Sequence, residues 1–357
     1  MTAGATVVGA GGDVRERTRA AMRAARRADQ RRAVGWIVGL AAGLVLLLGA
    51  SILLGGSASI AWSEIPPALL GRGRRLARYV VFETRLPRAL GAALSGAVFG
   101  LAGLFYQRVI RNPLATPDII GISSGASVGA VAVIVLTPSA GLGVQLASML
   151  GATAMIALVG LLSWRDGLDP YRVILIGIGM SAVASAATTY LLTLASLQGT
   201  EMATRWSTGS VAGLTWPEVA LLAGLVAAGG IAAVLFAPGL AGISLGDDLA
   251  RGLGTRVGQV RIGVLVAGAA LAALTTSVVG PIAFVSLICG PIAARLVPRG
   301  PQAALTMLLG AVLVVGADTL AQNAPLISPV PTGVLTSVIG APVFIWLMLR
   351  DRTEAAL

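Results

Sequence analysis

The stretch RNPLATPDIIGISSGASVGA, residues 111–130, separates two long apolar runs with an arginine, an asparagine, two prolines and an aspartate. Proline cannot continue a helix and disfavours helical backbone at the residue before it, so Asn112-Pro113 predicts a helix end. Pro117-Asp118 predicts the start of the next helix, because a proline and an acid both suit the first turn. The stretch therefore predicts two apolar helices joined by a short turn.

Glycines recur at helical spacing within this stretch. Gly121, Gly125 and Gly129 fall on one helix face. In a membrane, small residues at this spacing allow two backbones to approach closely and to pack by van der Waals contact. We therefore expect structural roles for these glycines, as for Asn112 and Pro113. Two further stripes have the same spacing: Gly35, Gly39 and Gly43, and Ala92, Gly96 and Gly100.

The whole chain is too apolar for a water-soluble domain of its size. Of its 357 residues, 56% are hydrophobic and 11% are charged, and the mean hydropathy is +0.88. Turn signals and charges divide it into about ten apolar runs, each near the roughly 20 residues that a helix needs to cross a bilayer. The sequence predicts an all-α, polytopic membrane protein, with spans near 34–55, 87–110, 118–136, 141–163, 172–196, 216–236, 261–279, 281–297, 303–323 and 333–349.

The charge pattern predicts three parts: a basic tail over 1–33, a single transmembrane domain over 34–350, and a short tail over 351–357. The first tail carries eight arginines and no apolar core, so it differs from a cleaved signal peptide. A solvated, membrane-proximal tail is favoured over a nucleic-acid-binding arm.

An even number of spans places both termini on one side of the membrane. With the termini inside, 19 of the 26 arginines fall on inner segments, so the positive-inside rule predicts cytoplasmic termini. The outer segment before the second span departs from this rule. Its arginines include Arg72, Arg74, Arg75 and Arg78, for which the sequence supplies no role.

Missing residue types exclude several kinds of chemistry. The 26 basic residues are all arginine and there is no histidine, so the chain has neither a P-loop lysine nor a histidine general base. The single Cys289 lies in an apolar run and is expected to be a packing residue. We therefore expect no catalytic residue, no metal site and no cofactor bound by this chain.

The largest polar island inside the apolar region is SLGDDLARGLGTRVGQVR, residues 244–261. Its pattern predicts a short amphipathic helix near 244–258 on the cytoplasmic face, with Ser244 as N-cap and Gly254 near its end. Two acids occupy its first turn, where the helix dipole favours them. The segment is either an interfacial connector or a docking helix for a soluble partner. Its apolar edge consists of Leu245, Leu249 and Leu253.

Polar residues in and beside the spans have two interpretations each. Small hydroxyls of the fifth span either bond to the preceding turn or line a path: Ser181, Ser185, Thr188 and Thr189. Asp318 either makes capping or interhelical bonds or relays protons. Arg85 and Arg88 either anchor the second span at the interface or receive an acidic protein surface.

Taken in order, six segments make the chain resemble the FecCD-type permeases, the membrane subunits of ABC importers for iron-siderophores, haem and vitamin B12. They are RLPRALGAALSGAVFGLAG with Gln107, RNPLATPDIIGISSGASVGA, WSTGS, LGDDLARGLGT, GPIAFVSLICGPIAARL and PTGVLTSVIGAPVF. The resemblance implies the type II importer fold, similar to the vitamin B12 permease, with ten helices per subunit. It also implies the bacterial inner membrane and a substrate path between two permease subunits.

The resemblance implies partners as well as a fold. Two ATPase subunits would carry ATP and Mg, a periplasmic or lipid-anchored binding protein would deliver the substrate, and membrane lipid would surround the bundle. Arg85 and Arg88 would dock the binding protein. The coupling segment, which would enter a cleft of the ATPase, would include Leu245, Gly246, Asp247, Asp248, Ala250, Arg251, Leu253 and Gly254.

Departures from the family pattern bear on the second permease subunit. Gln322 stands where an arginine commonly follows the aspartate of the ninth span, and NAPLISPVP, residues 323–331, lacks an arginine often found there. These departures favour a heterodimer. NPLATPDIIG favours an Fe(III)-siderophore over vitamin B12 or haem as substrate. An ion-coupled secondary transporter, the alternative of another class, would need paired acids near the membrane midplane.

Overall fold

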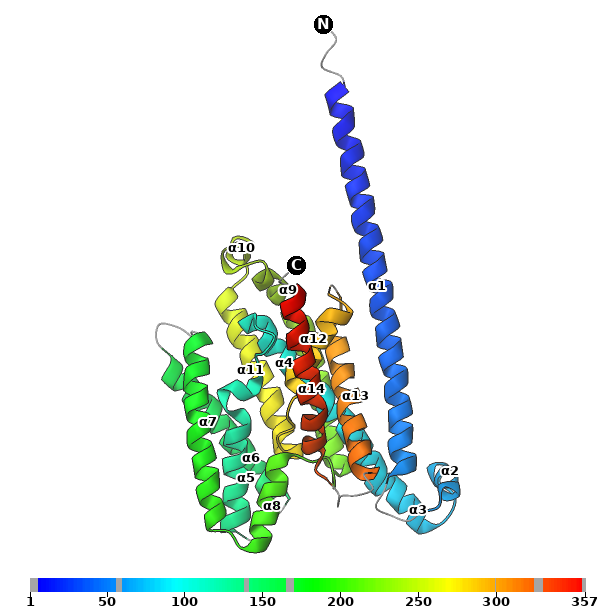
Figure 1. Cartoon of the computed structure of the whole chain (residues 1–357), viewed down its shortest axis with the longest axis vertical. Coiled ribbons are helices and arrows are strands. Elements are labelled where there is room, and N and C mark those ends of the chain that lie inside the picture. The colour runs from blue at the N-terminus through cyan, green and yellow to red at the C-terminus, as the bar shows by residue number, and fades with distance from the viewer. Residues whose placement is uncertain are drawn as a thin grey trace.

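The computed structural model describes residues 6–55, 60–137, 141–164, 170–298, 300–323 and 330–354, which form a helical bundle (Figure 1). Its longer helices are α1 (Thr6–Leu54), α4 (Leu86–Ile110), α5 (Ile122–Leu136), α6 (Leu142–Ser163), α7 (Pro170–Thr193), α8 (Leu197–Thr208), α9 (Trp216–Ser244), α11 (Val257–Val279), α12 (Val285–Leu296), α13 (Gln302–Asn323) and α14 (Thr332–Glu354). The short elements are η1 (Trp62–Glu64), α2 (Ile65–Leu69), α3 (Arg75–Tyr79), the π-helical η2 (Val80–Arg85), η3 (Pro117–Ile120) and α10 (Asp247–Gly252).

Each of the ten predicted spans coincides with an apolar helix in the described part of the chain. Within the described residues, 8 helices are long and apolar enough to cross a membrane, and α5 and α12 are shorter apolar helices. The eighth span was predicted to begin at residue 281, but α12 begins only at Val285. Gly280 and Phe284 have positive φ angles of 71° and 67°, so the backbone before α12 is not helical.

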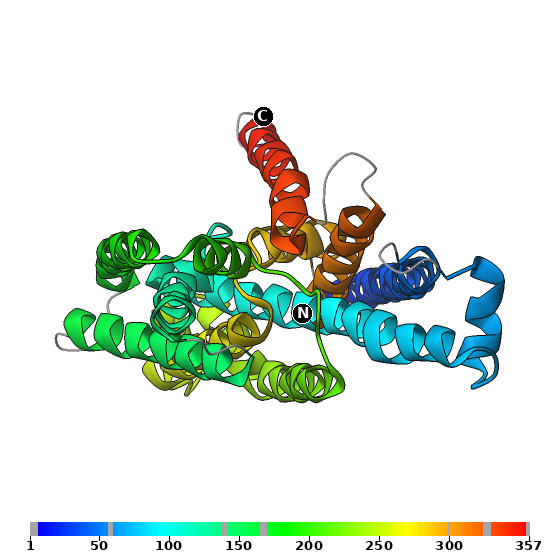
Figure 2. The ribbon, with the colours of Figure 1, turned by 90° about the horizontal axis from the view of Figure 1, so that it is seen from below.

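Helix α4 runs through the middle of the bundle (Figure 2) and is the most buried of the candidate spans. It is surrounded by α9, α11, α12 and α13. A Cβ atom on Gly96 would lie only 2.2 Å from the Gly310 carbonyl oxygen of α13, and one on Gly103 only 1.9 Å from that of Ser286 in α12. Small residues on α4 are therefore required where neighbouring backbones touch it.

Helices α5 and α6 pack by the same means. A Cβ atom on Gly125 would lie 2.6 Å from the Gly151 carbonyl oxygen, and one on Gly129 would lie 2.0 Å from that of Ala147. Gly121 has a different reason to be glycine, since its φ of 79° falls in the left-handed region at the start of α5. By contrast, Cβ atoms added to the stripe at residues 35, 39 and 43 would meet no heavy atom within 4 Å among the described residues.

The start of α1, the end of α14 and the short helix α10 lie at one end of the bundle, and α2, α3 and α8 lie at the other (Figure 1). Helix α1 continues through residues 33 and 34 without a break, and α14 continues past residue 350. The predicted tails are thus helical extensions of the outermost spans over the part that is described. The segment NAPLISPVP falls largely outside the described residues, as do Arg165 and Arg299.

Two features of the helices differ from the sequence prediction. Helix α8 was not predicted; Ser196 caps it by accepting a hydrogen bond from the Gly199 N–H at 3.1 Å. Ser244 was predicted to cap the coupling helix, but it is the last residue of α9, and its hydroxyl donates to the Ala241 carbonyl at 2.7 Å. Cys289 is buried in α12, as expected for a packing residue.

Candidate functional site

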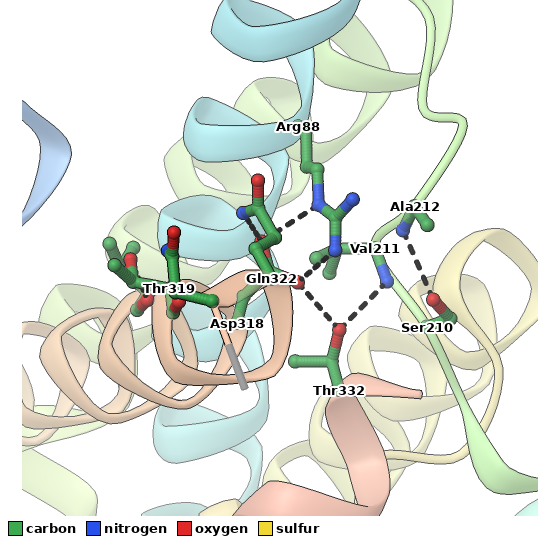
Figure 3. Close-up of polar contacts among 10 residues, drawn as sticks. Arg88, Ser210, Val211, Ala212, Asp318, Thr319, Gln322 and Thr332 are labelled. Atoms are coloured by element: carbon green, nitrogen blue, oxygen red, sulfur yellow. Dashed lines mark hydrogen bonds and ion pairs between the residues drawn. The ribbon is translucent and has the colours of Figure 1, made fainter. Parts of the chain in front are cut away.

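A buried polar network joins three helices and a loop at the end of the bundle where α8 lies (Figure 3). The guanidinium of Arg88 in α4 binds the Asp318 carboxylate of α13 in bidentate fashion, with Nε to Oδ2 at 2.9 Å and Nη2 to Oδ1 at 2.8 Å. Asp318 also accepts hydrogen bonds from the Gln322 amide at 2.7 Å and from the Thr332 hydroxyl at 2.9 Å. Four donors therefore satisfy a carboxylate whose side chain is 1% exposed.

The network continues from Asp318 into the loop after α8. The hydroxyl of Thr332, at the start of α14, accepts a hydrogen bond from the Val211 N–H at 3.4 Å. The Gly333 N–H donates to the Gly209 carbonyl at 3.0 Å beside it. Arg88 and Asp318 therefore fix the relative positions of α4, α13, α14 and this loop. Of the two interpretations of Asp318, the structure supports interhelical bonding.

Arg85 is held inside the chain as well. Its Nη1 donates to the Ile52 carbonyl at 2.7 Å and to the Leu53 carbonyl at 3.3 Å, and it thereby binds the last turn of α1. The residue is 7% exposed. In this chain both guanidinium groups bond to acceptors of the chain itself, and the docking of a binding protein at Arg85 and Arg88 stays a prediction.

At the opposite end of the bundle, α10 is fixed through its first residue. The Asp247 carboxylate binds Arg111, which follows α4, at 2.6 Å and Arg261 of α11 at 3.1 Å. Arg111 has a left-handed φ of 54° and also donates to the Ile243 carbonyl of α9. Burial works to raise the pKa of Asp247, but the two guanidinium groups outweigh it and hold the pKa below its ordinary value of 3.8.

The end of α10 is a Schellman motif. The Gly254 N–H donates to the Arg251 carbonyl at 2.9 Å, and the Thr255 N–H donates to the Ala250 carbonyl at 2.9 Å. Gly254 adopts the φ of 82° that the motif requires. Ala250 is buried with Ile243 and Val257, so one face of α10 rests on α9 and α11. The predicted helix near 244–258 is thus a six-residue helix between two tight turns.

The outward surface of α10 and its flanking turns carries three exposed leucines beside the exposed charges of Asp248 and Arg251. Leu245, Leu249 and Leu253 are 59%, 63% and 67% exposed at the tip of the bundle. Exposed leucines in a row cost solvation free energy unless a partner covers them. Of the two interpretations of this segment, its geometry favours a docking helix over a connector.

The four hydroxyl residues of α7 do not form one lining. Ser181 is half-buried, and its Oγ would lie 2.6 Å from a Cβ atom on Gly121, so Ser181 packs against the start of α5. Ser181, Thr188 and Thr189 each donate to the carbonyl four residues earlier, at 2.8, 3.0 and 3.0 Å. These bonds agree with the first of the two interpretations, in which the hydroxyls bond to the preceding helical turn. Ser185 and Thr189, on the exposed face of α7, remain candidates for a path.

Asn112 and Pro113 form the turn that the sequence predicts. The Asn112 side-chain oxygen accepts a hydrogen bond from the Leu114 N–H at 2.9 Å, and its backbone carbonyl accepts one from the Ala115 N–H at 3.0 Å.

A cavity of about 540 Å³ beside α8 was not predicted from the sequence. Its lining includes Gln145, Arg205 and Trp206. Helix α8, which lies beside this cavity, could have been predicted from Ser196, because a capping residue followed by an amphipathic stretch indicates a helix start.

The described residues form a polytopic helical bundle with an exposed, rigidly mounted loop helix, an architecture found in membrane transport proteins. The chain belongs to the FecCD transport family, whose model matches residues 43–350. It is an ABC transporter permease subunit and not an enzyme.

Curated relatives are similar over most of their length. The chain is 39% identical over 320 residues to the achromobactin transport system permease protein of Dickeya dadantii, covering 88% of this chain and 91% of the relative. It is 35% identical to the ferric enterobactin transport system permease protein of Escherichia coli, with 87% and 96% covered. A solved transporter described as of metal-chelate ABC type, in an inward-facing conformation, is 27% identical with a TM-score of 0.76, covering 88% and 98%.

Proposed function

We propose that this chain is the membrane permease subunit of an ATP-driven importer that moves an Fe(III)-siderophore across the bacterial inner membrane. The observation that carries the proposal is the similarity, over almost their full length, to permease proteins named for achromobactin and ferric enterobactin transport. The chain has no histidine and a single, buried cysteine, and its described residues hold no group of three or more Cys, Asp or Glu that could bind a metal ion, so the iron travels inside its chelator.

The mechanism is alternating access driven from α10. ATP binding closes two ATPase subunits on separate chains, which carry the ATP and Mg, and the ATPase moves the exposed leucines of α10. Asp247 transmits this movement to the ends of α4 and α11 through Arg111 and Arg261. The bundle shifts between outward and inward openings as rigid helices. A second, different permease subunit completes the path, and a binding protein delivers the chelate.

Ion-coupled transport finds less support in the structure. Such a transporter needs an acid that can gain and lose a proton or ion within the membrane. Asp318, the acid deepest in a predicted span, is occupied by Arg88, Gln322 and Thr332. The Asp318 carboxylate is thus already engaged in a structural network that joins α4, α13 and α14.

The decisive experiment is uptake by the reconstituted complex. The permease, its partner permease and its ATPase are placed in proteoliposomes with the binding protein, and entry of ⁵⁵Fe-labelled siderophore is followed. We expect uptake that requires ATP, stops with vanadate and survives a protonophore. Uptake that collapses with the protonophore and survives vanadate would overturn the ATP-driven mechanism. Competition by haem or vitamin B12, but not by siderophores, would overturn the substrate class.

A further inference from the structure

Between α1 and α4, the chain forms a small folded unit of residues 60–82 that we term the outer hairpin. It contains η1, α2 and α3 and has its own core, formed by Ile60, Ile65, Ala68, Ala77, Val80 and Val81. That core packs against Ile52 of α1 and Leu86 of α4. The outer hairpin is therefore a folded protrusion with a fixed attachment to the bundle.

Figures 1 and 2 place the outer hairpin at the end of the bundle opposite α10 and at its outermost edge, past α1. The helical run from Arg75 to Ile110 that carries it has 36 residues. Such a run is about 54 Å long, compared with roughly 30 Å for the hydrocarbon core of a bilayer. Because this run crosses the bundle at a strong tilt (Figure 2), it carries the hairpin sideways, to where a surrounding bilayer meets water.

The outer hairpin carries a dense group of cations. Arg72, Arg74, Arg75 and Arg78 are all exposed. Arg74 contacts Glu64 at 3.3 Å, and Arg78 donates to the Gly71 carbonyl at 3.2 Å. Glu64 is the acid within residues 60–82 and Glu83 follows directly, so four arginines outnumber two glutamates in this part of the sequence. An excess of positive charge therefore points away from the protein.

Large apolar side chains lie beside these cations. Trp62, Leu70, Leu76 and Tyr79 are 70%, 75%, 60% and 64% exposed. On α3, helical spacing groups Arg75 with Arg78, and Leu76 with Tyr79 on the neighbouring face. Exposed leucines favour hydrocarbon, aromatic rings favour the headgroup level, and arginine forks bind phosphate. The combination is typical of a segment that lies in a membrane interface.

We propose that the outer hairpin lies in the headgroup layer opposite α10 and that its four arginines bind the phosphates of anionic phospholipids. An acidic protein surface would also attract the arginines, but its charge alone would not account for the exposed Leu70 and Leu76 beside them. The position of the hairpin past α1 also favours lipid, because lipid surrounds the edge of the bundle.

The test counts lipids retained by the purified permease in native mass spectrometry, with phosphatidylglycerol and phosphatidylcholine offered together. We expect the wild type to prefer phosphatidylglycerol. The preference should fall several-fold in R72Q/R74Q/R75Q/R78Q and persist in R72K/R74K/R75K/R78K, which keeps the charge. In a pairwise comparison, R75Q/R78Q should lose more phosphatidylglycerol than R31Q/R32Q, which removes two exposed arginines from α1. The comparison of R75Q/R78Q with R31Q/R32Q still tests the proposal if the quadruple variant fails to fold.

Unchanged phosphatidylglycerol retention in R75Q/R78Q would overturn the proposal. Retention that stays unchanged while an acidic binding protein loses affinity would reassign the hairpin to protein docking. A nitroxide on L70C tests its depth: we expect more collisions with oxygen than with a water-soluble nickel complex, and the reverse would place the hairpin in water and overturn the proposal. These measurements do not involve transport, so their outcome does not depend on which molecule the permease transports.

Discussion

At the scale of single residues, the pair of Arg88 and Asp318 has the largest structural consequence. The two residues are 230 positions apart, yet they form a bidentate ion pair among buried helices. Sequence reasoning identified each one but assigned them separate roles, because chain distance gives no indication that α4 and α13 are neighbours. Within the chain, Arg88 acts as an interhelical clamp, and its predicted docking role stays a prediction. The same holds for Arg85, which binds the end of α1.

Replacing Arg88 with Ala should strongly destabilise the fold, because it leaves the Asp318 charge buried and unpaired. We expect a loss of about 3–5 kcal/mol. R88M/D318L, which replaces both charges with apolar groups, should recover most of that loss. Unfolding of the purified permease in mixed micelles by increasing denaturant measures both changes.

A matched control is available in the exposed pair of Arg74 and Glu64, with side chains 74% and 31% exposed. R74A should cost about 0–1 kcal/mol, since solvent screens this contact. Equal losses in R74A and R88A would contradict the clamp, as would a double variant R88M/D318L no more stable than R88A.

At the scale of elements, α10 shows how a six-residue helix can be rigid. Isolated helices of this length do not form in water. The glycine-ended turns, the burial of Ala250 and the two arginines on Asp247 hold α10 in place. The acids and the leucine edge were readable from sequence. The start was not, because α9 extends through Ser244 and pairing with distant arginines decides where α10 begins.

The attachment of α10 to the bundle should weaken at low pH. The folded-state pKa of Asp247 lies below 3.8, so its ion pairs stabilise the mounted helix above that pH. The stabilisation is lost as the pH falls through the lower, folded-state value. The protection factors of the amides of residues 247–255, which correct for the intrinsic pH dependence of exchange, should therefore fall only below about pH 4.

D247N should show the reduced protection factors already at pH 7. D248N serves as its control, because the Asp248 carboxylate is fully exposed and pairs only with Arg251 of the same helix among the described residues. If D247N exchanged like the wild type at pH 7, the arginine mounting would not be what fixes α10.

The leucine edge of α10 should carry the contact with the ATPase. Charges on L249D/L253D would have to be desolvated on docking, so we expect at least a tenfold loss of ATPase co-purification with unchanged membrane insertion. L197D, at the exposed start of α8 on the opposite end, is the control and should co-purify normally. Normal co-purification of L249D/L253D would argue against α10 as the docking element.

At the scale of the whole molecule, the sequence predicted which segments are apolar helices but not what lies between them. Apolar runs of membrane length and proline-marked turns located the ten helices, since each signal is local. Helix α8 and the non-helical backbone before α12 escaped prediction. Their positions depend on contacts with distant segments, such as Gly333 with Gly209 and Ser210 with the Val279 carbonyl.

The arrangement of the ends predicts a topology. The start of α1, the end of α14 and α10 share one end, and the outer hairpin lies at the other (Figure 1). We expect green fluorescent protein to fluoresce when fused to either terminus, and alkaline phosphatase to be active when inserted at residues 71–73, because the positive-inside rule predicts that the side with more arginines is cytoplasmic. Active phosphatase at either terminus would reverse the orientation.

The burial of the one thiol has a practical consequence. Cys289 is 1% exposed within α12, so a maleimide added from water should not reach it in the folded chain. The natural sequence is therefore a ready background for site-directed spectroscopy, with no native cysteine to remove. Single cysteines introduced at Leu249 and Leu70 would carry probes at opposite ends of the bundle, and a pair of such probes could follow the distance between α10 and the outer hairpin during the transport cycle.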